Sequence, residues 1–157
     1  ENVPEWKSSE LGLNSIFEEN SAQYGGAIHT EGVVTLLDGG TFVNNTANGT
    51  GGAINLYNGG TINLLANTTS FEFTGNIANG ISNAIHDNGG TVNLWSSQSA
   101  DIIFNDRITG NGTLNINSST TTLTANGKIL LNEDMSGYNG TTNLYNGNLE
   151  ITEGNNF

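Results

Sequence analysis

Short runs of alternating polar and apolar residues recur along the chain and predict β-strands. The runs TINL at 61–64 and TLNI at 113–116 place an apolar residue at every second position, which is the period of a half-buried strand. Gly and Asn-Gly separate such runs, and both residue types tolerate the positive φ angles of tight corners. Helices are not expected, because Gly and Asn form them poorly and no 3.6-residue apolar stripe appears. Only residues 8–19 have a pattern compatible with a short helical turn.

The same residues return along the chain at similar intervals. Each unit holds a Phe-x-x-Asn, then GGAI or a weaker form of it, then a third element, NGGTINL or NGGTVNL. Three strands and three corners in about 25–30 residues are typical of one coil of a parallel β-solenoid. The copies are Phe-x-x-Asn at 17–20, 42–45 and 73–76, GGAI at 25–28 and 51–54 with SNAI at 82–85, and the third element at 58–64 and 88–94.

The repeats predict an all-β fold, a right-handed parallel β-helix of about six coils, with successive strands about 4.8 Å apart. A single coil cannot bury its own apolar face, so equivalent residues stack on one another in such a fold. A disordered Gly/Asn-rich tract and a β-sandwich or propeller remain alternatives. The expected columns are Ala27, Ala53 and Ala84; Ile28, Ile54 and Ile85; Phe17, Phe42, Phe73 and Phe104; and an amide ladder of Asn20, Asn45 and Asn76.

Charge and composition exclude several classes of partner. The formal net charge is −12, and the chain has only three Lys and Arg residues. Nucleic acids and anionic lipid surfaces attract clustered basic residues, so neither is an expected partner. The chain has no cysteine, which excludes disulfides and thiolate zinc sites. No apolar run approaches the roughly 18 residues of a membrane helix, so direct membrane insertion of this segment is not expected.

The paired motifs resemble a known class of surface proteins. FEENSAQYGGAIH at 17–29 and FVNNTANGTGGAINL at 42–56 are similar to the repeats of chlamydial polymorphic membrane proteins. The stretch 111–151 resembles the autotransporter-associated β-strand repeat, with Tyr138 between Gly137 and Gly140 and NGNLEI at 146–151. The third unit departs from the pattern, with Ser82 and Asn83 in place of both glycines. The fourth has Arg107 where the motif has Asn.

This resemblance implies a passenger of a type V secretion autotransporter, located at the cell surface or secreted, on the extracellular face of a Gram-negative outer membrane. Its partners would be a host cell-surface protein or glycan, or identical chains. Residues 1–157 are expected to be one β-helix segment of a larger surface protein. It would comprise a lead-in or cap at 1–16, the Phe-x-x-Asn and GGAI repeats at 17–105 and autotransporter-like strands at 106–157.

Candidate catalytic and metal sites are few. Glycoside hydrolysis needs two carboxyl groups about 5–9.5 Å apart, and Asp101 and Asp106, with Arg107 beside them, are the best such group. His29 and His86 follow the AI of their units and are expected to lie two coils apart, too far to share a zinc ion. We therefore expect no enzyme and no cofactor. Weaker candidates are calcium at Glu18 and Glu19 or at Glu133 and Asp134, and ice binding by the Thr-rich run at 118–126.

Three aromatic residues are the candidate ligand contacts. Tyr57, Trp95 and Tyr145 each follow a strand residue Leu, and alternation from an inward Leu points them outward. There they would stack along one side of the rod and contact sugar rings or another rod. The sequence therefore favours a non-catalytic adhesin segment. A carbohydrate-active β-helix enzyme, either a polysaccharide lyase or a hydrolase, and a structural stalk that spaces a distal binding domain are the alternatives.

Overall fold

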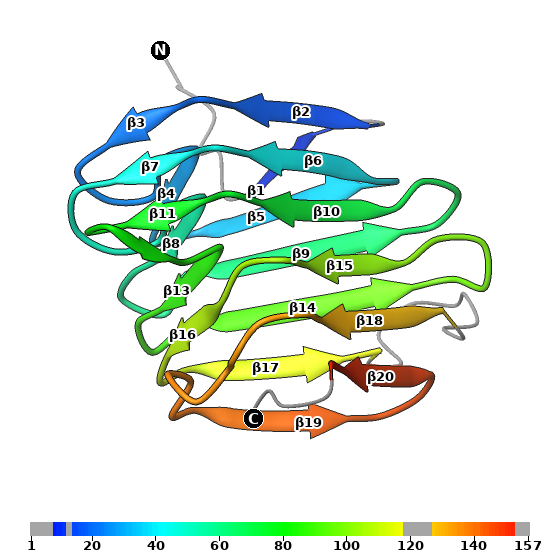
Figure 1. Ribbon diagram of the computed structural model, residues 1–157. Helices are drawn as coiled ribbons and strands as arrows, with labels where there is room; N and C mark the ends of the chain where they lie inside the picture. Colours follow the sequence, from blue (N-terminus) through cyan, green and yellow to red (C-terminus); the bar gives the residue numbers. More distant parts are fainter. Residues whose placement is uncertain (1–7, 12–13, 118–126, 153–157) are drawn as a thin grey trace, which may run out of the picture.

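The computed structural model describes residues 8–11, 14–117 and 127–152. These residues form strands and no helix, arranged as a stack of turns (Figure 1). The short helical turn expected within residues 8–19 is wrong, because strands β1 and β2 lie there.

Four sheets make up the stack. Sheet A contains β1 (Ser8–Leu11), β5 (Val33–Leu37), β9 (Thr61–Ala66), β14 (Thr91–Ser96), β17 (Thr113–Ile116) and β19 (Thr141–Leu144). Sheet B contains β2 (Ser15–Glu18), β6 (Gly40–Val43), β10 (Phe71–Thr74), β15 (Ile102–Phe104), β18 (Lys128–Leu131) and β20 (Asn148–Ile151). Sheet C contains β3 (Ser21–Ala22), β7 (Thr46–Ala47), β11 (Ile77–Ala78) and β12 (Ile81–Ser82). Sheet D contains β4 (Ile28–Thr30), β8 (Ile54–Leu56), β13 (Ile85–Asp87) and β16 (Ile108–Gly110).

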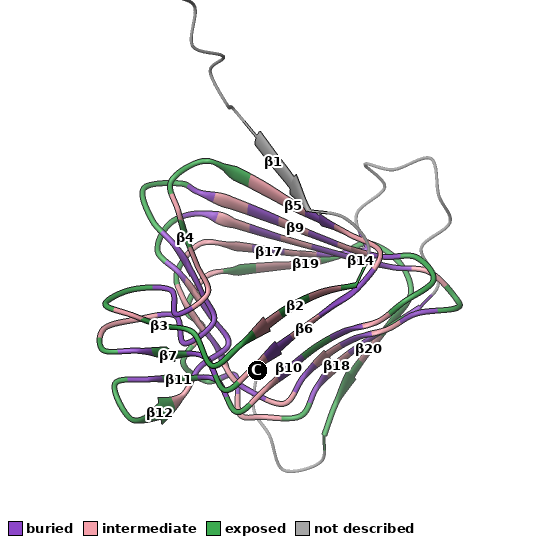
Figure 2. Cartoon of the chain, turned by 90° about the horizontal axis from the view of Figure 1, so that it is seen from above, coloured by how far each residue is buried: buried purple, intermediate pink, exposed green. Residues whose placement is uncertain are grey.

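The strands pair in parallel between successive turns, which confirms the predicted β-solenoid. The exception is β12, which pairs antiparallel with β11 and covers the edge of sheet C. Seen along the stack, the sheets surround one core, and purple buried segments alternate with exposed corners (Figure 2).

The stack has about four turns, as the four strands of sheet D indicate, and not the six predicted. The prediction relied on the short spacing of the first two units. In sheet B, Gly40 pairs with Ser15, 25 residues earlier. Phe71 then pairs with Gly40 and Ile102 with Phe71, each 31 residues apart. The longer turns use up the chain sooner.

Aromatic stacking forms one wall of the core. The ring centroids of Phe17 and Phe42 lie 4.5 Å apart, as do those of Phe42 and Phe73, and those of Phe73 and Phe104 lie 4.6 Å apart. The rings are parallel within 13°, so each stacks on its own kind at the strand spacing. Phe42, Phe73 and Phe104 are fully buried, which confirms the predicted column.

A column of amides runs through the corner between sheets B and C. Asn20 donates from Nδ2 to Oδ1 of Asn45 at 2.8 Å, and Asn45 donates in the same way to Asn76 at 2.9 Å. Asn45 and Asn76 are fully buried, and each Nδ2 also donates to a backbone carbonyl, that of Phe17 or Phe42. The amide ladder predicted at this corner is confirmed.

The GGAI motif marks a corner where two turns come close together. Gly25 and Gly51 have φ angles of +57° and +68°, which favour glycine. A Cβ on Gly26 would lie 2.2 Å from the carbonyl oxygen of Gly52, so no side chain fits there. The backbone N–H of Ala27 donates to Ala53, and that of Ala53 donates to Ala84. The predicted alanine column is therefore confirmed.

The weakened third motif reflects a shorter fourth turn. Phe104 and Ile108 are 4 residues apart, whereas their equivalents Phe73 and Ile85 are 12 apart. The fourth turn thus has no strand in sheet C, and its chain does not crowd Asn83 as the third turn crowds Gly52. Asn83 uses the space to donate from Nδ2 to Thr109 Oγ1 at 2.8 Å.

Candidate functional site

The three predicted aromatic contacts do not share one side of the rod. Tyr57 and Tyr145 are exposed, at 41% and 54%, but Trp95 is only 4% exposed, so the expectation that it points into solvent is wrong. Leu94, Trp95 and Ser96 are all buried at the end of β14, which means that both faces of this strand end are covered. Alternation predicts exposure only where one face of a sheet meets water. Tyr57 follows β8 in sheet D, whereas Trp95 lies in β14 of sheet A and Tyr145 follows β19 of that sheet.

A pocket of about 370 Å³ surrounds Tyr57 on the outer face of sheet D. Strands β4, β8 and β13 are in register, so residues at equivalent positions stand above one another. Two columns, two residues apart along each strand, share this face. The first column is His29, Asn55 and His86, and the second is Glu31, Tyr57 and Asn88.

Aromatic rings form the rim of the Tyr57 pocket. The His29 ring lies between two tyrosines, with centroid distances of 6.0 Å to Tyr24 and 6.1 Å to Tyr57. The three rings are tilted by 35° and 36°. Tyr24 packs over Gly49, where a Cβ would come within 2.5 Å of the ring. Both tyrosines remain partly exposed, so their faces are available for stacking.

Hydrogen bonds hold the floor of the pocket in place. Asn55 Nδ2 lies 2.9 Å from His29 Nδ1, and Asn55 Oδ1 accepts from Thr50 Oγ1 at 2.7 Å. His86 Nδ1 lies 3.0 Å from Thr109 Oγ1. Burial lowers the pKa of His86, so its imidazole is neutral at pH 7. Glu31 is the only acidic residue that lines the pocket.

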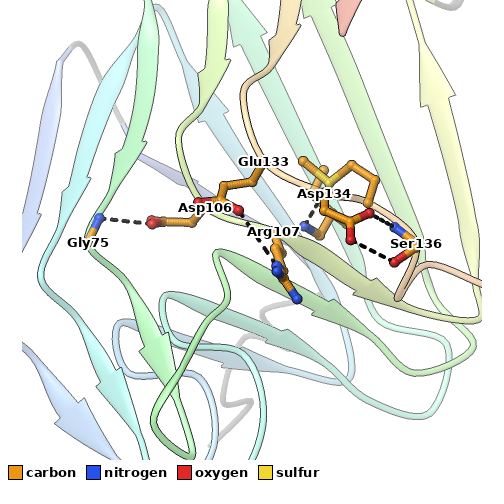
Figure 3. Close-up of polar contacts among 8 residues, drawn as sticks. Gly75, Asp106, Arg107, Glu133, Asp134 and Ser136 are labelled. Atoms are coloured by element: carbon orange, nitrogen blue, oxygen red, sulfur yellow. Dashed lines mark hydrogen bonds and ion pairs between the residues drawn. The ribbon is translucent and has the colours of Figure 1, made fainter. Parts of the chain in front are cut away.

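The two histidines do lie two coils apart, because Asn55 separates them in the register of sheet D. In the part of the chain that the structure describes, no group of three or more His, Cys, Asp or Glu residues could hold a metal ion. The proposed calcium ligands at 133 and 134 have other partners. Glu133 pairs with Arg107 at 3.7 Å, and Asp134 accepts from Ser136 N and Oγ at 2.9 and 3.0 Å (Figure 3).

The candidate catalytic group does not form a shared site. Asp101 and Asp106 flank opposite ends of β15. Asp106 is 3% exposed and turns inward, where Gly75 N donates to Oδ1 at 2.9 Å, while Arg107 turns to Glu133 (Figure 3). Asp101 Oδ1 accepts from Lys128 N at 3.1 Å. Burial raises the pKa of Asp106, and its hydrogen bonds with Gly75 and Asn76 oppose the shift.

Sequence reasoning missed several residues of the Tyr57 pocket, namely Tyr24, Glu31, Thr50 and Asn88. Glu31 and Asn88 stand in the Tyr57 column, so an alignment of the units at that position contains the signal. Tyr24 and Thr50 each precede the first glycine of a GGAI motif. The candidate ice-binding run at 118–126 lies outside the described residues.

No protein-family model, no curated protein and no solved structure matches this chain. Within the described ranges, no helix is long and apolar enough to cross a membrane. The functional argument therefore depends on the geometry of the Tyr57 pocket and on the motifs of the sequence.

Proposed function

We propose that the chain is a non-catalytic passenger segment of a bacterial, autotransporter-like adhesin, exposed on the extracellular face of a Gram-negative outer membrane. Its partner would be a host cell-surface protein or glycan, or an identical chain. The right-handed winding implied by the resemblance is part of this proposal. One observation carries it: the Tyr57 pocket combines exposed tyrosine rings with amide and hydroxyl groups on a rigid sheet, the chemistry of a binding surface.

Binding is favoured over catalysis because of the distribution of carboxylates. A polysaccharide lyase or hydrolase would need at least two acidic groups around its substrate. Glu31 is the only acidic residue at the Tyr57 pocket, and Asp106 is engaged by Gly75 and Asn76. Shape and hydrogen bonding remain as the work that this surface can do.

A bead assay tests the proposal. Beads coated with the chain should attach to epithelial cells, and the double variant Tyr24→Ala/Tyr57→Ala should lose this attachment, because both pocket rings are removed. Tyr145→Ala is the matched control, since Tyr145 is equally exposed but lies outside the pocket. Clumping of beads without cells would indicate self-association. If beads neither attach nor clump, the adhesin proposal fails and the stalk alternative is favoured.

A further inference from the structure

The two side-chain columns of the Tyr57 pocket continue along sheet D beyond it. His86 pairs with Thr109 in β16, and the next turn brings Gly137 to the same column through the bridge between Gly110 and Tyr138. Asn88 is followed by Asn111 and then by Asn139, whose backbone N–H groups donate to Asp87 and Gly110.

Hollows follow the columns without interruption. A second pocket of about 290 Å³ is lined by the lower members of both columns, from His86 and Asn88 to Gly137 and Asn139. His86 and Asn88 line the Tyr57 pocket as well. The two pockets are therefore one furrow parallel to the solenoid axis. At about 4.8 Å per strand, the four steps from Glu31 to Asn139 span roughly 19 Å.

We propose that this furrow binds an extended, uncharged oligosaccharide that lies along the axis, with one ring on the tyrosines and further rings over the Asn111 and Asn139 end. This inference rests on the proposed function and names the ligand of the same site.

The lining matches sugar hydroxyls. Asn and Thr side chains both donate and accept hydrogen bonds, as hydroxyl groups require. Asn111 Oδ1 is held by Gly89 N at 3.0 Å, which directs its Nδ2 group. Tyr24 and Tyr57 supply ring faces for the apolar faces of a sugar. The repetition of similar polar groups at strand spacing suits a polymer better than a compact ligand.

An extended peptide fits the furrow less well. A peptide usually binds a sheet by adding a strand at an edge, where backbone groups are free. Strands β8 and β13 lie between neighbours on both sides, so their backbone groups already bond to adjacent turns. A ligand on this face is recognised through side chains alone.

Charge favours a neutral ligand. Among the residues of the two columns, Glu31 is the only acidic residue, and none is Lys or Arg. The chain carries a net charge of −12, so polyanionic sugars are repelled at low ionic strength.

The test combines ligand length with variants at each end of the furrow. Chito- and cello-oligosaccharides of one to six rings, within a wider panel of neutral glycans, are titrated against the intact chain, with hyaluronan hexasaccharide as an acidic comparison. Affinity should rise with the number of rings. Tyr57→Ala should weaken every bound length about tenfold. Asn139→Ala should weaken only the longer ligands, by about two- to tenfold, which corresponds to one hydrogen bond. Asn146→Ala, an exposed amide outside the furrow, should change nothing.

Three results would overturn the inference: equal affinity for short and long ligands, no effect of Asn139→Ala on long ligands, or no binding to any panel member at millimolar concentration. A preference for hyaluronan would also contradict it. If no glycan binds but Tyr24→Ala/Tyr57→Ala still abolishes cell attachment, the proposed function stands and only the oligosaccharide inference falls. If attachment also survives the double variant, both fall.

Discussion

Asp106 accepts hydrogen bonds from the backbone N and the side-chain Nδ2 of Asn76, at 2.9 and 2.7 Å. It therefore ends the amide column that runs from Asn20 through Asn45. Every Nδ2 in this column donates toward the next turn, so the last member only has to accept. An ionised carboxylate does only that.

The capping role of Asp106 makes its removal costly. Asp106→Ala would leave Gly75 N, Asn76 N and Asn76 Nδ2 without their acceptor. Each unsatisfied buried donor costs about 1–3 kcal/mol, so the free energy of unfolding in urea should fall by at least about 2 kcal/mol. Asp101→Ala, which removes a partly exposed acceptor of one N–H group, should cost far less. Equal losses in the two variants would contradict the capping role.

Gly52 is expected to be intolerant of any side chain. A Cβ there would lie 2.4 Å from the carbonyl oxygen of Asn83 and 2.5 Å from the nitrogen of Ile77. Relief requires a shift of backbone between two turns, so Gly52→Ala should lower the free energy of unfolding by about 3 kcal/mol or prevent folding. At Gly32 the nearest atom to a Cβ is 3.8 Å away. Gly32→Ala should therefore stay within about 0.5 kcal/mol of the parent in the same denaturation experiment. A stable, cooperatively unfolding Gly52→Ala variant would show that the turns can separate.

Phe73 stacks between two rings, whereas Phe17 stacks on one. Phe73→Ala should cost about 3–5 kcal/mol, because a fully buried ring leaves a cavity between rigid neighbours. Phe17→Ala should cost less, since Phe17 is only partly buried. Chemical denaturation of both variants and of Phe73→Leu gives the comparison. A loss at Phe17 as large as that at Phe73 would argue against a cooperative stack.

The stacking of equivalent residues was predictable because the repeats carry it directly. Phe42, Ala53 and Asn45 each repeat in kind and in order, and a solenoid is the fold in which such repetition has a physical use. The number of turns was less accessible, because the turns vary in length and the fourth omits sheet C. Asp106 was hidden for the same reason: it comes two residues after its Phe, whereas each Asn of the column comes three after.

The candidate site was predicted only in part. Tyr57 was found by alternation, but the furrow needs the register between turns, which aligns Tyr57 with Glu31 and Asn88 across units of unequal length. Trp95 failed because alternation along one strand carries no information on what covers its outer face. Local patterns describe one turn, whereas the site is made by the relation between turns.

Asp87 places a carboxylate inside the solenoid. It is fully buried in β13, accepts from Gly90 N at 2.7 Å, and lies 3.5 Å from the hydroxyl of Tyr138. Burial raises the pKa of Asp87 above its ordinary value of 3.8, and the hydrogen bond from Gly90 opposes this shift only in part. Burial, together with the charge of Asp87, also raises the pKa of the Tyr138 hydroxyl.

The raised pKa predicts a pH dependence that Asp87→Asn should remove. A carboxyl group with a folded-state pKa above its unfolded value stabilises the fold most below pH 3.8 and loses this contribution as the pH rises through the folded-state pKa. An amide at position 87 keeps an acceptor for Gly90 and carries no charge, so its stability lacks this loss. The variant should gain on the parent as the pH rises from below 3.8 to 7, when both are unfolded in urea at a series of pH values. Asp101→Asn, at a partly exposed carboxylate, serves as the control and should track the parent at every pH. If Asp87→Asn instead loses stability relative to the parent as the pH rises, the carboxylate is stabilised in its charged form and the burial argument is wrong.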